Sequence, residues 1–407
     1  MARLIIVAVI VVVVAVAAYV VLEPVPDDVG DRPWAVKMSS LRSNLKPYLK
    51  WWTPTGLNQW LEEKSAGVSR ATEPQVPYRH AVFDRVPVRI FDDGPAGGRT
   101  DKRQAIVYYH GGGFISGNLD THHPITALLA RRLNAVVVSI DYLLSPKYPF
   151  PAAIDDCTAA TVWFLKHLSE YNVDPARVAL MGDSAGGNLA AAVSQRFTFD
   201  PKYLVLPKIK LQILLYPCLQ AFDFQTPSYQ QNGDYKTLLL DRPLMTFMWD
   251  SYLRGNKASY CEAMRTNSHT SAAAKRSQLV QKCLSHDLIP DEFKQKGYEA
   301  PSTDFGDESI YNEIKEVLLN PDYAPLMRED LRGLPEAYIL TAQYDILRDD
   351  GIMYAKRLEE AGVPVTWKHY KTGFHAMFTG KQDLPVVTTP TGIQSVSDLL
   401  HFARANL

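Results

Sequence analysis

The chain contains a serine set between glycines, in the pentapeptide Gly182-Asp183-Ser184-Ala185-Gly186. An apolar run precedes it and a small-residue, helix-favouring run follows, which is the strand–turn–helix context of a nucleophile elbow. Glycines without Cβ atoms let strand and helix approach closely, and a strained turn lifts the Ser184 hydroxyl clear of the sheet. Ser184 then lies at a helix N-terminus, where free N–H groups favour negative charge. The pattern predicts a nucleophilic serine.

A serine hydroxyl is a poor nucleophile at neutral pH, so it needs a base and a group that orients the base. Asp345 and His375 each follow a late apolar run, and Gly373 helps to bound the loop of the histidine. We expect His375 to accept the proton of Ser184 and Asp345 to fix the imidazole tautomer. The chain order Ser, Asp, His is the order found in α/β-hydrolases.

Other acids and histidines lie near these positions and suit different roles. Asp349 and Asp350 come after Asp345 at a place where they better cap or open the next helix. His369 falls inside the final predicted strand. His122 and His123 are expected to be polar surface or pocket wall. The sequence contains no metal-binding spacing such as His-Glu-x-x-His, so no metal is predicted.

Three consecutive glycines follow an early predicted strand, in His110-Gly111-Gly112-Gly113-Phe114. Such a run is costly in entropy, which implies that bare backbone is needed there. The N–H groups of Gly112 and Gly113, with that of Ala185, are expected to bind the oxygen of a tetrahedral intermediate. Losing one such donor typically raises the barrier by about 3–4 kcal/mol. His110 is expected to brace the loop. The alternatives are a flexible loop or a phosphate cradle, but the Gly-Lys-Ser/Thr of a Walker cradle is absent.

Strand-like and helix-like runs alternate around these motifs. Strands are expected at 86–91, 104–109, 135–142, 177–181, 210–216, 335–341 and 363–370. Helices are expected from Pro151, over 349–361 and from Gly392. The alternation predicts the α/β class, with a mainly parallel sheet covered by helices on both faces.

The alternation stops between residues 217 and 332, which are rich in Gln, Asn, Asp and Lys. We interpret this stretch as a mostly helical cap over the C-terminal edge of the sheet, which would form a substrate pocket and exclude water. The predicted division is a signal-anchor helix, N-terminal cap or linker helices, the first part of the core, the cap and the second part of the core. These occupy residues 1–23, 24–80, 81–216, 217–332 and 333–407.

The N-terminus carries an unbroken apolar run from Leu4 to Leu22, as long as a bilayer core when helical. Arg3 precedes the run and acidic residues follow it, so the positive-inside rule places the N-terminus in the cytoplasm. We expect an uncleaved single-pass anchor with the catalytic part in the endoplasmic reticulum lumen. A cleaved signal peptide is the alternative, because residues 15–17 read Ala-Val-Ala.

Between residues 24 and 73 the sequence predicts short amphipathic helices near the anchor. They carry Trp34, Trp51, Trp52 and Trp60. These tryptophans are expected either to rest at the membrane interface or line a substrate entrance, or simply to pack on the main domain.

Composition excludes several other classes of protein. The chain has 407 residues and a formal net charge of -1, which gives no reason to expect a nucleic-acid partner. Its four cysteines are too few and too scattered for a disulfide scaffold or a zinc site. Cys261 and Cys283 could pair in an oxidising lumen, and free buried thiols are the alternative.

Taken together, the motifs resemble those of the hormone-sensitive-lipase group of α/β-hydrolases. The matching residues are His110-Gly111-Gly112-Gly113, Asp141-Tyr142, Pro149-Phe150-Pro151-Ala152, Gly182-Asp183-Ser184-Ala185-Gly186-Gly187, Tyr344-Asp345 and Gly373-Phe374-His375. Further motifs, together with the N-terminal anchor, resemble the arylacetamide deacetylase and neutral cholesterol ester hydrolase family: Leu215-Tyr216-Pro217, Pro227-Ser228-Tyr229-Gln230 and Leu347-Arg348-Asp349-Asp350-Gly351. The resemblance implies a microsomal, lumen-facing esterase or deacetylase without a cofactor.

The chain departs from the family pattern at three positions. Phe114 stands where the family usually has Trp, Leu143 where Arg is usual, and Ala376 where Gly is usual. No catalytic group is removed, but a supporting salt bridge at Leu143 could be missing, and the pocket could differ in shape.

The sequence supports one main functional hypothesis. This is a membrane-anchored serine hydrolase that cleaves lipid or aryl esters through an acyl-enzyme, with acetyl amides as further candidate substrates. A catalytically silent ligand-binding protein on the same fold is the alternative, although the loop of His375 is intact. A peptidase is weaker, because nothing marks a peptide-binding groove.

Overall fold

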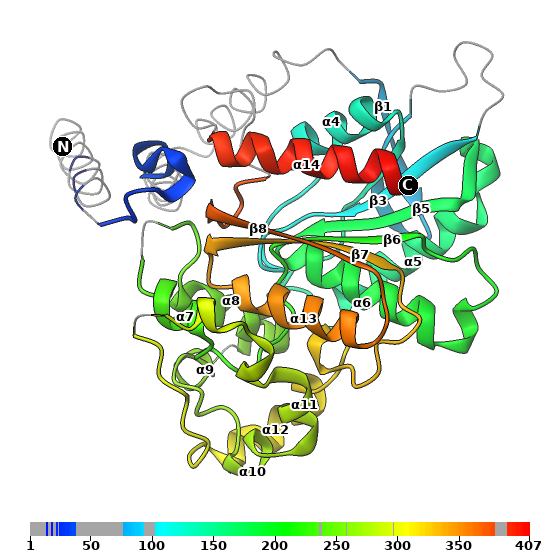
Figure 1. Cartoon of the computed structure of the whole chain (residues 1–407). Helices are drawn as coiled ribbons and strands as arrows, with labels where there is room; N and C mark the ends of the chain where they lie inside the picture. The colour runs from blue at the N-terminus through cyan, green and yellow to red at the C-terminus, as the bar shows by residue number, and fades with distance from the viewer. Residues whose placement is uncertain are drawn as a thin grey trace, which may run out of the picture.

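A twisted eight-stranded sheet runs through the molecule in the order β1-β2-β4-β3-β5-β6-β7-β8 (Figure 1). The computed structural model describes residues 14, 18, 22, 24–37, 76–92, 102–235, 238–257, 259–295, 297–378 and 389–407. The strands are β1 Tyr78–Phe83, β2 Val86–Phe91, β3 Arg103–Tyr109, β4 Val136–Ile140, β5 Val173–Asp183, β6 Leu211–Leu215, β7 Glu336–Tyr344 and β8 Val365–Phe374. β2 pairs antiparallel with β1 and β4, and the other pairs are parallel.

Helices cover both faces of the sheet (Figure 1). One face carries α4 His123–Leu133 and α14 Pro390–Asn406, and the other carries α5 Ala152–Lys166, α6 Ala185–Phe199 and α13 Arg348–Glu360. Each face buries its own apolar cluster, because a buried parallel strand presents side chains to two helical layers. The prediction of a mainly parallel sheet between helical layers is confirmed.

The segment between β6 and β7 forms short helices on the α13 side of the sheet (Figure 1). They are α7 Pro227–Asn232, α8 Arg242–Arg254, α9 Cys261–Arg265, α10 Ala272–Lys275, α11 Gln278–Leu284 and α12 Glu308–Leu318. Short 3-10 turns are η1 Val29–Asp31, η2 Leu168–Tyr171, η3 Pro201–Tyr203, η4 Gly255–Lys257, η5 His286–Leu288, η6 Asp291–Phe293 and η7 Pro325–Met327, and residues 33–37 are also helical. We call residues 217–332 the cap.

Sequence reasoning did not predict helix α4, and it also missed the edge strand β1. Most of its side chains are exposed, so it lacks the dense apolar run that marked the inner strands. It extends across the predicted division at residue 80. The other expected strands and helices are present, with ends that differ by a few residues: the helix expected from Pro151 begins at Ala152, and that expected over 349–361 begins at Arg348.

The predicted anchor at 4–22 lies outside the described residues apart from Val14, Ala18 and Leu22. Within the described part of the chain, no helix has the length and apolar character needed to span a bilayer. Trp51, Trp52 and Trp60 also lie outside it.

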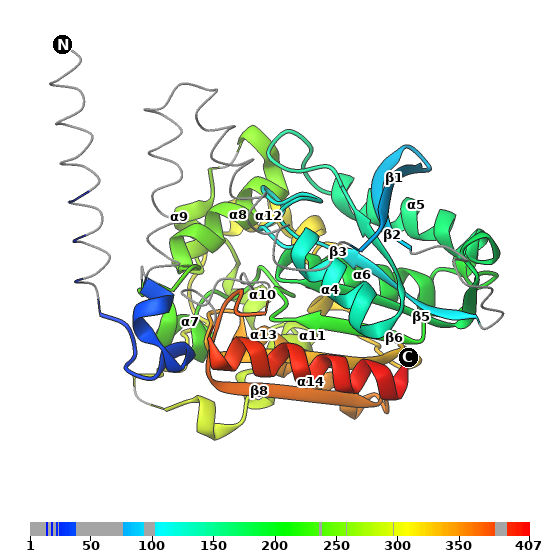
Figure 2. The ribbon, with the colours of Figure 1, turned by 90° about the horizontal axis from the view of Figure 1, so that it is seen from above.

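Residues 24–37 lie beside the ends of β8 and the start of α14, as two perpendicular views show (Figures 1 and 2). Val29 and Val36 are fully buried in the apolar cluster that contains Phe374. Trp34, in contrast, is 52% exposed. This segment therefore packs on the main domain.

Candidate active site

Ser184 occupies the sharp turn between β5 and α6. Its backbone has φ 55° and ψ −119°, a region that non-glycine residues rarely adopt and that indicates local strain. The turn is crowded: a Cβ at Gly186 would lie 1.9 Å from the carbonyl oxygen of Tyr109 at the end of β3. The Ser184 N–H donates to Leu215 O at 2.9 Å, which ties the elbow to β6. The predicted elbow geometry is therefore present at Ser184.

Asp345 and His375 meet Ser184 although they lie far away along the chain. His375 Nδ1 donates to Asp345 Oδ2 at 2.8 Å, and Ser184 Oγ lies 3.1 Å from His375 Nε2. All three side chains are buried. The histidine ring also packs edge-on against Tyr216, with ring centroids 5.0 Å apart. The structure thus brings together the three residues selected from the sequence, in the order needed for proton transfer from Ser184 to His375.

The rival acids have other partners. Asp349 and Asp350 lie in the first turn of α13, where the sequence placed them. Asp349 pairs with the buried Arg348 at 2.8 Å and accepts from Ser228 N at 2.6 Å. Asp350 accepts from Leu219 N at 2.8 Å. Both carboxylates therefore fasten the cap to α13.

The glycine loop after β3 lies against the elbow. Gly112 and Gly113 have φ +124° and +62°, which favour glycine. The N–H groups of Gly112, Gly113 and Ala185 have no acceptor within the described ranges. Ala185 is the first residue of α6, so its N–H adds to the positive end of the helix dipole. These three N–H groups remain the candidate donors to an oxyanion.

His110 has the bracing position predicted for it. Its Nδ1 hydrogen-bonds Gly111 O at 2.9 Å, and its ring stacks on Tyr142 with centroids 4.2 Å apart. Tyr142 also donates to His110 O at 2.6 Å. Burial lowers the pKa of His110 to about 3, and the nearby His122 adds to this effect. His110 is thus neutral near pH 7 and unsuited to carrying protons there.

Asp183, the residue before the serine, is a functional candidate that the sequence reasoning passed over. Its buried carboxylate accepts from Gly111 N at 3.0 Å and from Tyr108 Oη at 2.7 Å. His122 Nε2 lies 3.4 Å away. Burial acts to raise the pKa of Asp183, but His122 and the hydrogen bonds outweigh it and hold this pKa below its usual value. The signal available in the sequence was a carboxylate directly before the serine. The carboxylate of Asp183 joins the elbow to the glycine loop.

The other histidines have structural contacts. His123 Nδ1 lies 3.2 Å from Arg89 Nη1, and His369 in β8 contacts Thr341 Oγ1 at 3.0 Å. Burial lowers the pKa of His369 to about 4, with the nearby Arg348 contributing in the same direction. Among the described residues, no group of three or more His, Cys, Asp and Glu side chains could hold a metal ion.

Helix α8 of the cap covers the glycine loop. A Cβ at Gly113 would lie 2.1 Å from the sulfur of Met248, so this thioether touches the loop backbone. Phe114 stacks on Tyr252 with ring centroids 3.9 Å apart. Phe114 and Ala376 are two of the three positions at which the chain departs from the family pattern. Phe114 packs in an aromatic cluster under α8, and Ala376 adopts φ +63° after His375. At the third, Leu143 N donates to Asp156 Oδ2 at 3.1 Å.

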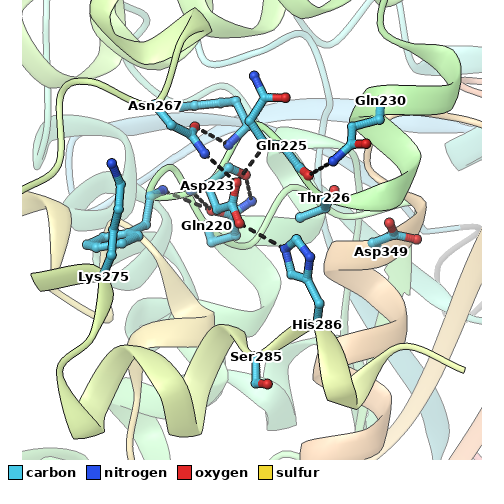
Figure 3. A network of polar contacts seen from close by, with 12 residues as sticks. Gln220, Asp223, Gln225, Thr226, Gln230, Asn267, Lys275, Ser285, His286 and Asp349 are labelled. Carbon is cyan, nitrogen blue, oxygen red and sulfur yellow. Dashed lines mark hydrogen bonds and ion pairs between the residues drawn. The ribbon is translucent and has the colours of Figure 1, made fainter. Parts of the chain in front are cut away.

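A polar network holds the outer part of the cap together. Figure 3 shows Asp223 at its centre, with His286 pointing toward its carboxylate at 2.9 Å. Asn267 Nδ2 donates to the same carboxylate at 2.6 Å. Gln220 donates both to Asp223 O and to Asp350 Oδ1, at 2.8 and 3.0 Å. The network therefore joins the cap to the helix that follows Asp345.

All four cysteines are free thiols. Cys261 Sγ donates to Asp250 Oδ2 at 3.2 Å, and Cys283 is buried. The pairing of Cys261 with Cys283, which the sequence left open, is not formed in this structure.

The fold and the site define the class of protein, and comparisons with known proteins agree. The model of the α/β-hydrolase fold family matches residues 106–292 and 285–379. Rat neutral cholesterol ester hydrolase 1 is 41% identical over 89% of this chain and 90% of its own length. Bovine arylacetamide deacetylase is 34% identical over 94% and 95%. The chain belongs to this family of α/β-hydrolases, so the resemblance drawn from its motifs is confirmed.

Solved structures show the same architecture. A hyperthermophilic esterase from the archaeon Pyrobaculum calidifontis is 25% identical, with a TM-score of 0.61 over 89% of this chain and 97% of its own. An esterase structure from Rhizomucor miehei is 27% identical, with a TM-score of 0.61 over 86% and 90%. The chain is therefore an enzyme of the carboxylesterase and lipase type.

Proposed function

We propose that this protein is a serine hydrolase that cleaves carboxylic esters through an acyl-enzyme. The observation that carries the proposal is the continuous contact from Ser184 Oγ to His375 to Asp345, at 3.1 and 2.8 Å. Nucleophile and base at hydrogen-bond distance, with the base oriented by a carboxylate, are the parts that acyl transfer requires.

The reaction follows from this geometry. Ser184 Oγ attacks the ester carbonyl carbon while its proton passes to His375 Nε2. Asp345, on the other ring nitrogen, stabilises the imidazolium that forms. The N–H groups of Gly112, Gly113 and Ala185 donate to the carbonyl oxygen as it becomes negative. The C–O bond then breaks, and the leaving alcohol takes the proton from His375.

A water molecule repeats the sequence on the acyl-enzyme. His375 takes a proton from the water, the resulting hydroxide attacks the acyl carbon, and the Ser184 oxygen leaves and regains its proton from His375. The products are a carboxylic acid and the free enzyme.

The proposed substrates are lipid or aryl esters, with acetyl amides as further candidates. The support is the named activities of the similar rat and bovine proteins and the apolar and aromatic side chains of α8 over the glycine loop. Hydrolysis rates across an acyl-chain series, with ester and amide versions side by side, test this choice. A maximum at long chains supports a lipid ester, whereas fast acetyl amide cleavage supports deacetylation.

We further propose that the apolar run 4–22 anchors the protein in the endoplasmic reticulum membrane, with the catalytic domain in the lumen. Protease protection of sealed microsomes tests this topology. The catalytic domain should resist digestion until detergent opens the vesicles, and digestion in sealed vesicles contradicts the proposal.

Replacing the nucleophile tests the mechanism. Ser184→Ala should abolish hydrolysis of a short p-nitrophenyl ester and labelling by a fluorophosphonate probe. Ser194→Ala is the matched control, because Ser194 is buried on the same helix and only donates to Ala190 O. Unchanged turnover in Ser184→Ala would refute the proposal. Absence of labelling in the unaltered protein favours the alternative of a silent ligand-binding protein.

A further inference from the structure

Residues 28–36, which we call the clasp, contact the two strands that carry the acid and the base. Tyr344 Oη donates to Asp28 Oδ1 at 2.5 Å, although these residues are 316 positions apart. Thr391, at the start of α14, donates to the carboxylate of Asp31. Figures 1 and 2 both show this segment beside the end of β8 and the start of α14. The clasp is thus fastened to the second half of the core.

The contacts fall on one pair of neighbouring residues. Tyr344 in β7 pairs with Phe374 in β8, and these are the last partners in the register of the two strands. Asp345 follows Tyr344 directly and His375 follows Phe374 directly. Any shift of this pair therefore moves the carboxylate and the imidazole.

The clasp fits this pair closely. Gly30 has φ +62°, and a Cβ there would lie 2.9 Å from Phe374 Cε1 and 3.0 Å from Thr389 Cγ2. Val29 and Val36 on either side are fully buried. Tyr344 is thus contacted through a hydrogen bond and Phe374 through van der Waals packing.

We infer that the clasp is a positioning element for catalysis, which holds Tyr344 and Phe374 so that Asp345 and His375 stay aligned with Ser184. The inference rests on the proposed function. The clasp lies outside the part of the chain that matches the family model, which begins at residue 106. Leu22, the end of the predicted anchor, precedes Asp28 by six residues.

The first test places a side chain at the contact with Phe374. Gly30→Val in the full-length protein should lower kcat per active site about tenfold or more, since small misplacements of reacting groups are costly. KM should change little. Gly362→Val is the control, because Gly362 also has a positive φ of +76° but nothing lies within 4 Å of its added Cβ.

The second test removes only the hydrogen bond. Tyr344→Phe should lower kcat about threefold, a loss that corresponds to roughly 0.7 kcal/mol of barrier. Tyr370→Phe is the control. Tyr370 also lies in β8, and this variant removes a tyrosine–aspartate hydrogen bond of 2.8 Å to Asp398 without touching the Tyr344–Phe374 pair. This variant keeps the inference testable if Gly30→Val does not fold.

The readout must separate positioning from folding. Titration with a fluorophosphonate counts active sites, so kcat is expressed per competent molecule. A loosened carboxylate stabilises the imidazolium less, so the acid limb of the kcat/KM profile should move to lower pH in both variants and in neither control. Partial unfolding reduces the count of sites without moving this limb.

Two outcomes overturn the inference. In the first, Tyr344→Phe and any Gly30→Val protein that folds both keep the kcat per active site of the unaltered protein, and the acid limb of their kcat/KM profile does not move. The other is a loss of the same size in the matched controls. Failure of the proposed function looks different, because the unaltered protein itself would then neither react with the probe nor turn over an ester.

Discussion

The two halves of the active site are built in different ways. The elbow is locked against the end of β3 by backbone packed on backbone: a Cβ at Gly186 would lie 1.9 Å from Tyr109 O, and one at Gly182 would lie 2.1 Å from Gly186 O. The loops of Asp345 and His375 are instead held by side chains from remote segments. Asn232 of the cap donates to Asp345 O at 3.4 Å. Asp28 accepts a hydrogen bond from Tyr344, the residue before Asp345.

This difference determines what each half tolerates. Backbone contacts cannot relax around an added methyl group, so the first half should respond to substitution in an all-or-none manner. Side-chain hydrogen bonds contribute about 0.5–1.5 kcal/mol each, so the second half should respond in graded steps. The exception is the carboxylate that touches the base, because it acts in the chemistry itself.

The largest expected effect is at that carboxylate. Asp345→Asn should lower kcat by about 10³–10⁴, because an amide in place of the carboxylate favours the wrong imidazole tautomer. Asp349→Asn is the contrasting variant, since it breaks the buried pair with Arg348 and should cost about 3–5 kcal/mol of stability. Active-site titration with kcat measurements separates the two. An equal loss of kcat per site in both would contradict the assignment of Asp345.

The next largest effect tests the rigid half. Gly186→Ala should lower kcat by about two to three orders of magnitude, because the added methyl group pushes the elbow away from the donors of the oxyanion. Circular dichroism and kcat per titrated site are the measurements. Gly362→Ala is the control at an open position. A Gly186→Ala enzyme with nearly full activity would show that this half is not rigid.

A smaller effect is expected where the cap supports the acid loop. Ser228 Oγ donates to Ile346 O at 2.6 Å, and Ser228→Ala removes this bond while keeping the backbone contact to Asp349. We expect kcat to fall about threefold to tenfold and stability by about 1–2 kcal/mol. Thr246→Ala, which removes a bond to Arg242 O within α8, should leave kcat per site unchanged. Equal kcat values for the two variants would mean that the cap does not support this loop.

The last expected effect is on the pH dependence of stability and leaves the chemistry itself untouched. The pKa of His110 is lowered by burial from 6.5 to about 3, so the unfolded chain binds one more proton between these pH values. Its stabilising contribution is complete above about pH 6.5 and is lost as pH falls toward 3, by up to about 1.4 kcal/mol per unit. His110→Asn should flatten this slope. Urea unfolding at pH 7 and pH 5 measures it, and an unchanged slope contradicts a neutral, buried His110.

The sequence predicted the elbow well because its cause is local. Gly182 and Gly186 are spaced for one tight turn. The apolar run before them and the helix-favouring run after them leave few other conformations. The same holds for the glycine loop, where backbone N–H groups are needed whatever surrounds them. The inner strands, such as β4 and β6, were predicted because burial on both faces selects dense apolar runs.

The sequence did not predict the supports of the acid and base. β1 was missed because its exposed edge carries no apolar run, and Asp183 because a carboxylate next to a serine has no fixed meaning in one dimension. The contacts of Asp28 and Ser228 join segments 316 and 118 positions apart. Nothing in local spacing encodes such pairs.

By itself the sequence determined the proposed chemistry: which side chain would attack, which would accept the proton, and where bare backbone would be required. These choices depend on residue type and on steric limits within a few positions. Only the tertiary structure decided how the acid and the base are held in register with Ser184. That alignment arises from many weak contacts between distant segments, and their sum exists only when the whole chain is folded.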